Sequence, residues 1–410
     1  MTSTLDPAGP EADGIPDFPM ARAAGCPFDP PPRARELQDE ARLARVRLWD
    51  GSTPWLVTRY ADQRELLADP RVSADITRPG YPSPAPLPPG GPAVSFILMD
   101  NPEHGRLRRM VTAPFTVRRI EGLRPAVQKI VDDTLDEMLA GPNPVDLVEA
   151  FALPVPSLVI CELLGVPYRD HDFFQANSKV IIKRDAEPAE RAAGHRALLD
   201  YLDELMGEKL ARRGDDLLSG LADRVEAGEL TRNEAAQMGV LLLIAGHETT
   251  ANMIALGTLT LLNHPDQLAV LRETDDPKVI AGAVEELLRY LTITHNGRRR
   301  VALEDIELAG RTIRAGEGLI MANDIANRDA AVFPDPDGLD LRRPDSRRHV
   351  AFGFGVHQCL GQPLARVELQ VVYRTLYRRV PTLALAGDPA GIPFKHNGSV
   401  YGVYELPVTW

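Results

Sequence analysis

Cysteine is scarce in this chain of 410 residues, which has only Cys26, Cys161 and Cys359. Three scattered cysteines cannot build a disulfide framework, and no CxxC pair is present. Both facts argue against a cysteine-rich zinc site and against covalent attachment of a c-type haem. Cys161 lies in the apolar stretch PSLVICELLG and is expected to be a buried structural thiol. Cys26, in the proline-rich N-terminal segment, suggests no role.

Positive charge and long apolar runs are also in short supply. The chain has 46 Lys and Arg against 58 Asp and Glu, a net charge of −12. Such a surface repels phosphate backbones and anionic lipids, so we expect neither nucleic acid nor a membrane as partner. The N-terminal sequence lacks the basic start and apolar core of a signal peptide, and no stretch reaches the ~18 apolar residues of a membrane span. We therefore expect a cytoplasmic protein.

The remaining pattern predicts one large domain after a short leader. Residues 1–34 are rich in Pro, Gly and Asp and are expected to be an extended leader, with a single catalytic domain at 35–410. Helical apolar spacing recurs at 123–138, and the capping box TRNE predicts a long helix over 231–263. Short strands are expected at 53–60 and 300–323. The predicted fold class is mainly α, with small β-sheets.

The sequence FGFGVHQCLG places Cys359 among glycines. Gly353, Gly355 and Gly361 would allow a tight loop beneath a flat ligand, with backbone N–H groups directed at the sulfur. A helix with proline in its first turn follows and would bring its positive end near the thiolate. A lone thiolate suits an axial metal bond better than a zinc cage. An inert cysteine in a glycine-rich turn explains the same residues.

A polar island, AGHETTAN, interrupts the long predicted helix. It is not a zinc HExxH motif, because residue 251 is alanine. The Thr249 hydroxyl could bond back to the carbonyl of Ala245 and loosen the helix. Together with the Glu248 carboxylate it could bind a small polar molecule and move protons to it. The alternative is a polar, solvated stripe, but apolar runs flank the island on both sides.

Glu286 and Arg289 in EELLRY lie three residues apart and can pair on one helix face. The same ExxR spacing recurs at 103–106, 121–124 and 229–232, so spacing alone indicates little.

Taken together, these stretches resemble a cytochrome P-450, a soluble bacterial haem-thiolate monooxygenase. FGFGVHQCLG is similar to its haem-ligand loop and AGHETT to its oxygen-groove signature. EELLRY supplies the ExxR motif in the order expected for the family, after the long helix and before the cysteine. NRDAAVFPDPDGLDLRR resembles the segment that supplies a second arginine, here Arg343. The ending YGVYELPVTW resembles an actinomycete subfamily that oxidises secondary metabolites, steroids and xenobiotics.

The resemblance implies a cofactor, haem b, and a role for each matching residue. Cys359 would be the axial iron ligand, within a loop that includes Phe352, Gly353 and Gly361. Thr249 would bond dioxygen and Glu248 would help to deliver protons. Glu286, Arg289 and Arg343 would form a buried structural network. The haem propionates would be bound by His104, Arg108, Arg300 and His357.

The resemblance also suggests the substrate pocket and the partners. The pocket would comprise the 75–98 loop, the 177–193 region, residues 292–295 with Ile293 and His295, Leu243, Ala245 and Val400. The proline-rich loop at 78–92 would act as a mobile lid over a bulky polyketide, macrolide or steroid-like molecule. His295 would bond a substrate oxygen or point to solvent.

Electrons would come from NAD(P)H through a separate ferredoxin and ferredoxin reductase, because the chain has neither a GxGxxG fingerprint nor a cysteine set for an iron–sulfur cluster. Arg347, Arg348 and Arg366 could dock an acidic ferredoxin, or form a solvated basic face. Two alternatives remain: a peroxide-driven peroxygenase or haem isomerase, and a non-catalytic haem-based sensor.

Overall fold

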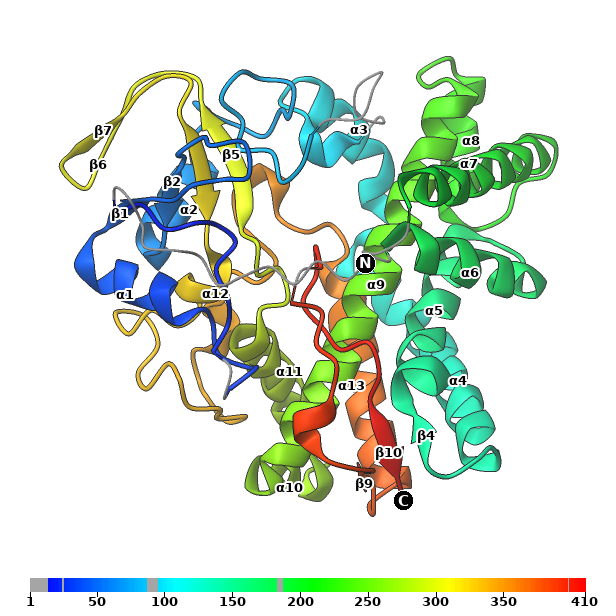
Figure 1. Cartoon of the computed structure of the whole chain (residues 1–410). Helices are drawn as coiled ribbons and strands as arrows, with labels where there is room; N and C mark the ends of the chain where they lie inside the picture. Colours follow the sequence, from blue (N-terminus) through cyan, green and yellow to red (C-terminus); the bar gives the residue numbers. More distant parts are fainter. Residues whose placement is uncertain (1–13, 24–25, 87–94, 183–186, 397) are drawn as a thin grey trace.

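The computed structural model describes residues 14–23, 26–86, 95–182, 187–396 and 398–410. Helices dominate, and a smaller sheet region lies at one side of them (Figure 1). The helices are α1 (Pro32–Glu40), α2 (Tyr60–Ala68), α3 (Glu103–Thr112), α4 (Val117–Ala140), α5 (Pro154–Leu164), α6 (His171–Ile182), α7 (Pro188–Ala211), α8 (Leu217–Glu226), α9 (Arg232–Asn263), α10 (Pro265–Glu273), α11 (Pro277–Leu291), α12 (Asn323–Ala326) and α13 (Gln362–Arg379). The predicted fold class is confirmed.

Within the described residues the strands form three small sheets. They are β1 (Leu43–Arg45), β2 (Trp55–Val57), β3 (Val72–Ser73), β4 (Val145–Asp146), β5 (Arg298–Ala302), β6 (Ile306–Leu308), β7 (Arg311–Ile313), β8 (Gly318–Met321), β9 (Ala384–Leu385) and β10 (Pro407–Thr409). The largest sheet has the order β1-β2-β8-β5-β3, in which only β2 and β8 run parallel. The strand predicted at 53–60 is shorter than expected, because Tyr60 already begins α2.

Helix α9 runs through the middle of the helical region (Figure 1) and has the predicted boundaries. Thr231 caps it: its side chain accepts the Glu234 N–H, and the Glu234 carboxylate accepts the Thr231 N–H at 2.8 Å. By length and composition α9 could cross a membrane, although no membrane span is predicted from the sequence. However, 72% of its most apolar stretch is buried inside the protein, as is usual for the core helix of a globular fold.

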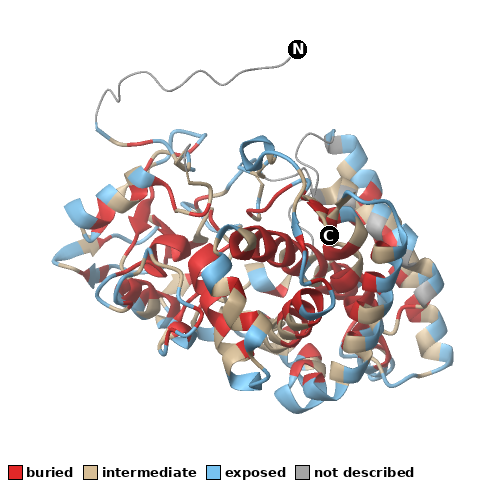
Figure 2. Ribbon diagram, turned by 90° about the horizontal axis from the view of Figure 1, so that it is seen from below, coloured by how far each residue is buried: buried red, intermediate tan, exposed pale blue. Residues whose placement is uncertain are grey.

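Buried residues gather at the centre of the molecule and exposed residues surround them (Figure 2). The largest apolar cluster joins α4, α5, α9, α11 and α13, and smaller clusters cover the two faces of the main sheet. The described part of the N-terminal segment packs on this body: Phe18 N–H donates to the Arg47 carbonyl at 2.8 Å, and Phe28 is buried. The division between a leader at 1–34 and a domain at 35–410 stays a prediction.

Candidate active site

The loop before α13 holds Cys359 in a fixed position. The Cys359 N–H donates to the Phe352 carbonyl at 2.9 Å. Gly353 and Gly355 both have φ of +74°, in the left-handed region that glycine adopts without strain. Gly361 differs from the prediction, since its φ of −78° is available to any residue. A Cβ at Gly361 would lie 4.0 Å from the Cys359 sulfur, an ordinary contact distance.

The Cys359 sulfur is buried beside cations and backbone donors. Burial is the largest effect and raises the pKa of the thiol overall, and the guanidinium groups of Arg298 and Arg108 and the backbone N–H groups of Gly361 and Gln362 offset part of that rise because they favour the thiolate. Gln362 is the first residue of α13, so the positive end of that helix contributes two of these donors. The backbone donors that the sequence suggested are therefore present in the structure.

A cluster of cationic and neutral nitrogen groups lies beside the loop. The rings of His104 and His357 are 4.0 Å apart between centroids. Both ring nitrogens of His104, and Nδ1 of His357, are buried and have no hydrogen-bond partner among the described residues. Burial, reinforced by Arg300, His104, Arg108 and Arg298, lowers the pKa of His357 to about 3. The Asp100 carboxylate influences the pKa values of His104 and Arg300, but its recorded hydrogen bonds come from Ser73 and Ala74 and not from this cluster.

The three arginines of the cluster are held by backbone carbonyl groups. Within the described part of the chain, none of them forms an ion pair with a carboxylate, and their carbonyl partners are Gln358 for Arg108, Ala351 for Arg298 and Arg299 for Arg300. Arg298 was not among the predicted residues. It could have been found, because it precedes Arg300 by two residues on β5 and therefore projects from the same face.

These residues fit a haem. A dianionic propionate edge would supply acceptors for the buried imidazole nitrogens and for Arg298 Nε, and counter-charge for the three guanidinium groups. The thiol has backbone donors and cations around it that stabilise a thiolate ligand. Among the described residues no group of three or more His, Cys, Asp and Glu could hold a metal ion, whereas a haem needs only one protein sulfur.

The polar island of α9 is also ordered as its sequence suggested. The Thr249 hydroxyl donates to the Ala245 carbonyl at 2.7 Å. Ala245 is exposed although α9 is otherwise mostly buried, so a ligand can reach the helix here. The Glu248 carboxylate is buried and accepts hydrogen bonds of 2.9 Å from both Asn252 and Lys395. Lys395, 147 residues away, was not predicted.

The predicted ion network is fully buried. Glu286 accepts two hydrogen bonds of 2.7 Å from Arg289, and Arg343 Nε lies 3.1 Å from the same carboxylate. Glu286 and Arg289 have no exposed side-chain surface. Two of the other ExxR pairs, at 103–106 and 121–124, are ion pairs on the surface, so burial distinguishes this pair from those two.

A second carboxylate beside this network was missed. Glu285 accepts hydrogen bonds from His349 at 3.0 Å and from Arg366 at 2.6 Å. Burial would raise the pKa of Glu285, but these two partners outweigh it and lower the pKa to about 2. The Arg366 guanidinium also lies 4.7 Å from the Phe352 ring. Arg366 is thus engaged inside the protein, whereas Arg347 and Arg348 are exposed.

The predicted pocket residues are placed as follows. Leu243 and Ile293 are buried and Val400 is half-buried. Part of the predicted 75–98 loop (87–94) and part of the 177–193 region (183–186) lie outside the described residues. His295 neither points to solvent nor offers its Nε2 freely, because that atom lies 3.0 Å from the Gly398 carbonyl.

His295 makes folding stability depend on pH. Burial, with Arg22 nearby, lowers the pKa of His295 to about 4. Because the folded value lies below the ordinary ~6.5, this group favours folding above pH 6.5 and loses that contribution as pH falls toward 4. We expect the free energy of unfolding to drop by up to about 2 kcal/mol more in the wild type than in His295→Gln between pH 7 and pH 5. Equal losses in denaturant titrations would contradict this.

Comparison with known proteins identifies the family. The family model "Cytochrome P450" matches residues 171–380. "Cytochrome P450 GfsF" of Streptomyces halstedii is 60% identical over 100% of this chain and 99% of its own, and the GfsF crystal structure superposes with a TM-score of 0.92, covering 97% and 100% of the two chains. The chain therefore belongs to the cytochrome P450 family, binds haem b and is a monooxygenase.

Two further relatives carry substrate names. The "20-oxo-5-O-mycaminosyltylactone 23-monooxygenase" of Streptomyces fradiae is 44% identical over 96% of this chain and 92% of its own. The crystal structure of the mycinamicin VIII C21 methyl hydroxylase MycCI of Micromonospora griseorubida, bound to mycinamicin VIII, is 44% identical with a TM-score of 0.88. That comparison covers 97% of this chain and 100% of MycCI.

Proposed function

We propose that the enzyme hydroxylates or epoxidises a bulky macrolide-like molecule, with electrons supplied by a separate ferredoxin and ferredoxin reductase. The observation that carries the proposal is likeness over almost the whole chain to relatives named for macrolide oxidation. One oxygen atom of dioxygen enters the substrate, and the other leaves as water after taking up electrons and protons in equal number. We expect the reaction to take place in the cytoplasm, where NAD(P)H is available.

The bound haem supplies the iron centre at which dioxygen is activated. Cys359 would hold the iron as its thiolate, stabilised by Arg298 and by the N–H groups at the start of α13. His104, Arg108, Arg300 and His357 would hold the propionates, and Arg298, whose charge also acts on His357, would join them. Glu286, Arg289 and Arg343 would fix the segment between α12 and the Cys359 loop.

Thr249 and Glu248 would deliver protons to the bound dioxygen. The Thr249 hydroxyl donates a hydrogen bond to the Ala245 carbonyl, so the lone pairs of its oxygen stay available to accept a hydrogen bond from another donor. Glu248 precedes Thr249 on α9, and its buried carboxylate would deliver protons to the part of the helix that is accessible at Ala245. An acid and an alcohol side by side suit dioxygen chemistry better than a peroxide-driven reaction.

A binding panel tests the substrate class. Mycinamicin VIII, a steroid and a small planar aromatic would each be titrated into the haem-loaded enzyme, with the Soret shift as readout. We expect the macrolide to bind at least about tenfold more tightly than the aromatic, a difference of roughly 1.4 kcal/mol. A shift produced only by the small aromatic would overturn the macrolide proposal. Turnover with peroxide alone that equals turnover with NAD(P)H and the two partner proteins would overturn the proposed electron route.

A further inference from the structure

The C-terminal hairpin contacts both predicted pocket residues and the buried carboxylate of α9. It comprises residues 393–396 and 398–404, and its strands meet at the bridge between Phe394 and Val403. The Lys395 N–H donates to the Gly402 carbonyl at 2.8 Å, and the Tyr404 N–H donates to the Pro393 carbonyl at 2.8 Å. These bonds join the two sides of the hairpin.

Near its tip, the hairpin is hydrogen-bonded to residues 293–296, which include predicted pocket residues. The Tyr401 N–H donates to the Ile293 carbonyl at 2.8 Å, and the Gly398 carbonyl accepts from Asn296 at 2.9 Å and lies 3.0 Å from His295 Nε2. Ile293 and His295 are predicted pocket residues, as is Val400 within the hairpin. Anything that binds in that pocket therefore meets the hairpin.

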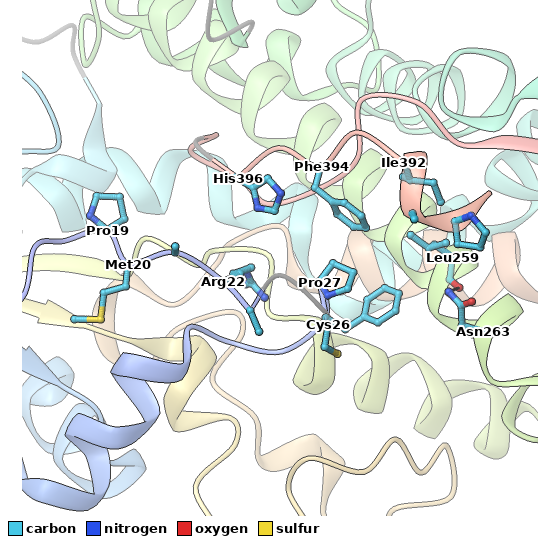
Figure 3. Close-up of a pocket in the computed structure, with 15 residues that line it drawn as sticks. Pro19, Met20, Arg22, Cys26, Pro27, Leu259, Asn263, Ile392, Phe394 and His396 are labelled. Carbon is cyan, nitrogen blue, oxygen red and sulfur yellow. Dashed lines mark hydrogen bonds between the residues drawn. The ribbon is translucent and has the colours of Figure 1, made fainter. Parts of the chain in front are cut away.

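The outer side of the hairpin faces a separate cavity of about 940 Å³ (Figure 3). Phe394 and His396 line this cavity together with Leu259 and Asn263 of α9. Lys395, between Phe394 and His396, does not line the cavity, and its side chain reaches the Glu248 carboxylate of α9.

Lys395 reaches the carboxylate that the proposed function uses. Its Nζ lies 2.9 Å from Glu248 Oε1, and the two side chains are 14% and 8% exposed. Asn252 donates to the same oxygen at 2.9 Å. The hairpin approaches α9 so closely that a Cβ at Gly402 would collide with the Asn252 amide. Glu248 is therefore held from one side by its own helix and from the other by the hairpin.

Two other titratable side chains, Tyr404 and His247, lie beside this pair. The centre of the Tyr404 ring is 5.6 Å from Lys395 Nζ. His247 is buried on α9, and burial, together with Lys395, lowers its pKa while Glu248 raises it. Its Nε2 has no hydrogen-bond partner in the described part of the chain. A neutral His247 cannot replace the ammonium group of Lys395 as the counter-charge of Glu248.

We propose that Lys395 is a positioning residue that holds Glu248 back from proton delivery until the hairpin moves. The inference rests on the proposed role of Glu248. A buried carboxylate that is paired with an ammonium group is fixed in direction, and it must leave that partner to carry a proton elsewhere. Because the hairpin forms part of the proposed pocket wall, substrate binding would be the event that moves it.

The test uses substrate-free, haem-loaded enzyme with ferredoxin, its reductase and NADPH. We expect Lys395→Met to raise NADPH consumption by about fivefold, equal to about 1 kcal/mol, because Glu248 is released. Lys395→Arg keeps the charge and should behave as the wild type. Lys209→Met is the matched control, since Lys209 pairs with Asp216 at 2.5 Å and is also 14% exposed. The rise should vanish in the double variant Lys395→Met, Glu248→Gln.

A second measurement needs no turnover. In thermal unfolding, Lys395→Met and Glu248→Gln should each lower the midpoint, and the double variant should unfold no lower than the less stable single variant. Additive losses would overturn the pairing. If the losses in unfolding midpoint are not additive but Lys395→Met leaves NADPH consumption unchanged, the Lys395–Glu248 pairing stands. Only the proposal that Lys395 holds Glu248 back from proton delivery is then overturned. If Glu248→Gln leaves product formation unchanged with substrate present, the proposed proton role of Glu248 fails instead.

Discussion

Glu286→Ala is expected to yield protein that is mostly unfolded or free of haem. The substitution leaves Arg289 and Arg343 buried without their carboxylate, and removing one member of a buried ion pair costs about 3–5 kcal/mol. That is comparable with much of the stability of an ordinary domain. The measurement is the yield of soluble holoprotein, followed by its thermal unfolding midpoint.

Glu121→Ala is the matched control for this change. Glu121 and Arg124 have the same ExxR spacing on a helix, but their side chains are 49% and 37% exposed. An exposed pair of this kind contributes about 0–1 kcal/mol, so the control should fold and bind haem normally. Equal recovery of holoprotein from the two variants would mean that burial of the Glu286 network does not matter.

The Thr249→Ala variant is expected to bind haem normally, but most of the electrons from NADPH should form hydrogen peroxide instead of product. The change removes a hydroxyl from the accessible part of α9 while leaving the Glu248–Lys395 pair in place. Loss of a positioned proton-handling group lowers the rate of its step by about 10²–10⁴-fold. We expect product formed per NADPH consumed to fall by at least about tenfold, with hydrogen peroxide rising in its place.

Thr249→Ser keeps the hydroxyl and should recover most of the product yield. Both variants should show the same haem content and the same substrate-induced Soret shift as the wild type, because neither change touches the Cys359 loop. Unchanged coupling of NADPH consumption to product in Thr249→Ala would remove Thr249 from the proposed mechanism.

The sequence predicted the features that depend on neighbouring residues. The capping box of α9, the back-bond from Thr249 to Ala245 and the donors at the start of α13 are all local, so residue type and spacing determine them. Helix boundaries were less accurate where the first turn is polar: α4 begins at Val117, ahead of the apolar spacing that starts at residue 123.

The features that the sequence did not predict are long-range contacts. Lys395 contacts Glu248, which is 147 residues away in the sequence. Glu285 contacts His349 and Arg366, which are 64 and 81 residues away. No periodicity links such positions, because their proximity depends on how α9, α11 and the C-terminal hairpin pack. Sequence likewise could not tell that the His295 ring is directed at the Gly398 carbonyl.

The most direct measurement is the absorption spectrum of the reduced, carbon-monoxide-bound protein, for the wild type and for Cys359→His. We expect the wild type to show the long-wavelength Soret band of a thiolate-ligated haem and the variant to lose it while still binding haem. The same long-wavelength band in both proteins would show that Cys359 is not the iron ligand. In that case the proposed site around the Cys359 loop would be wrong.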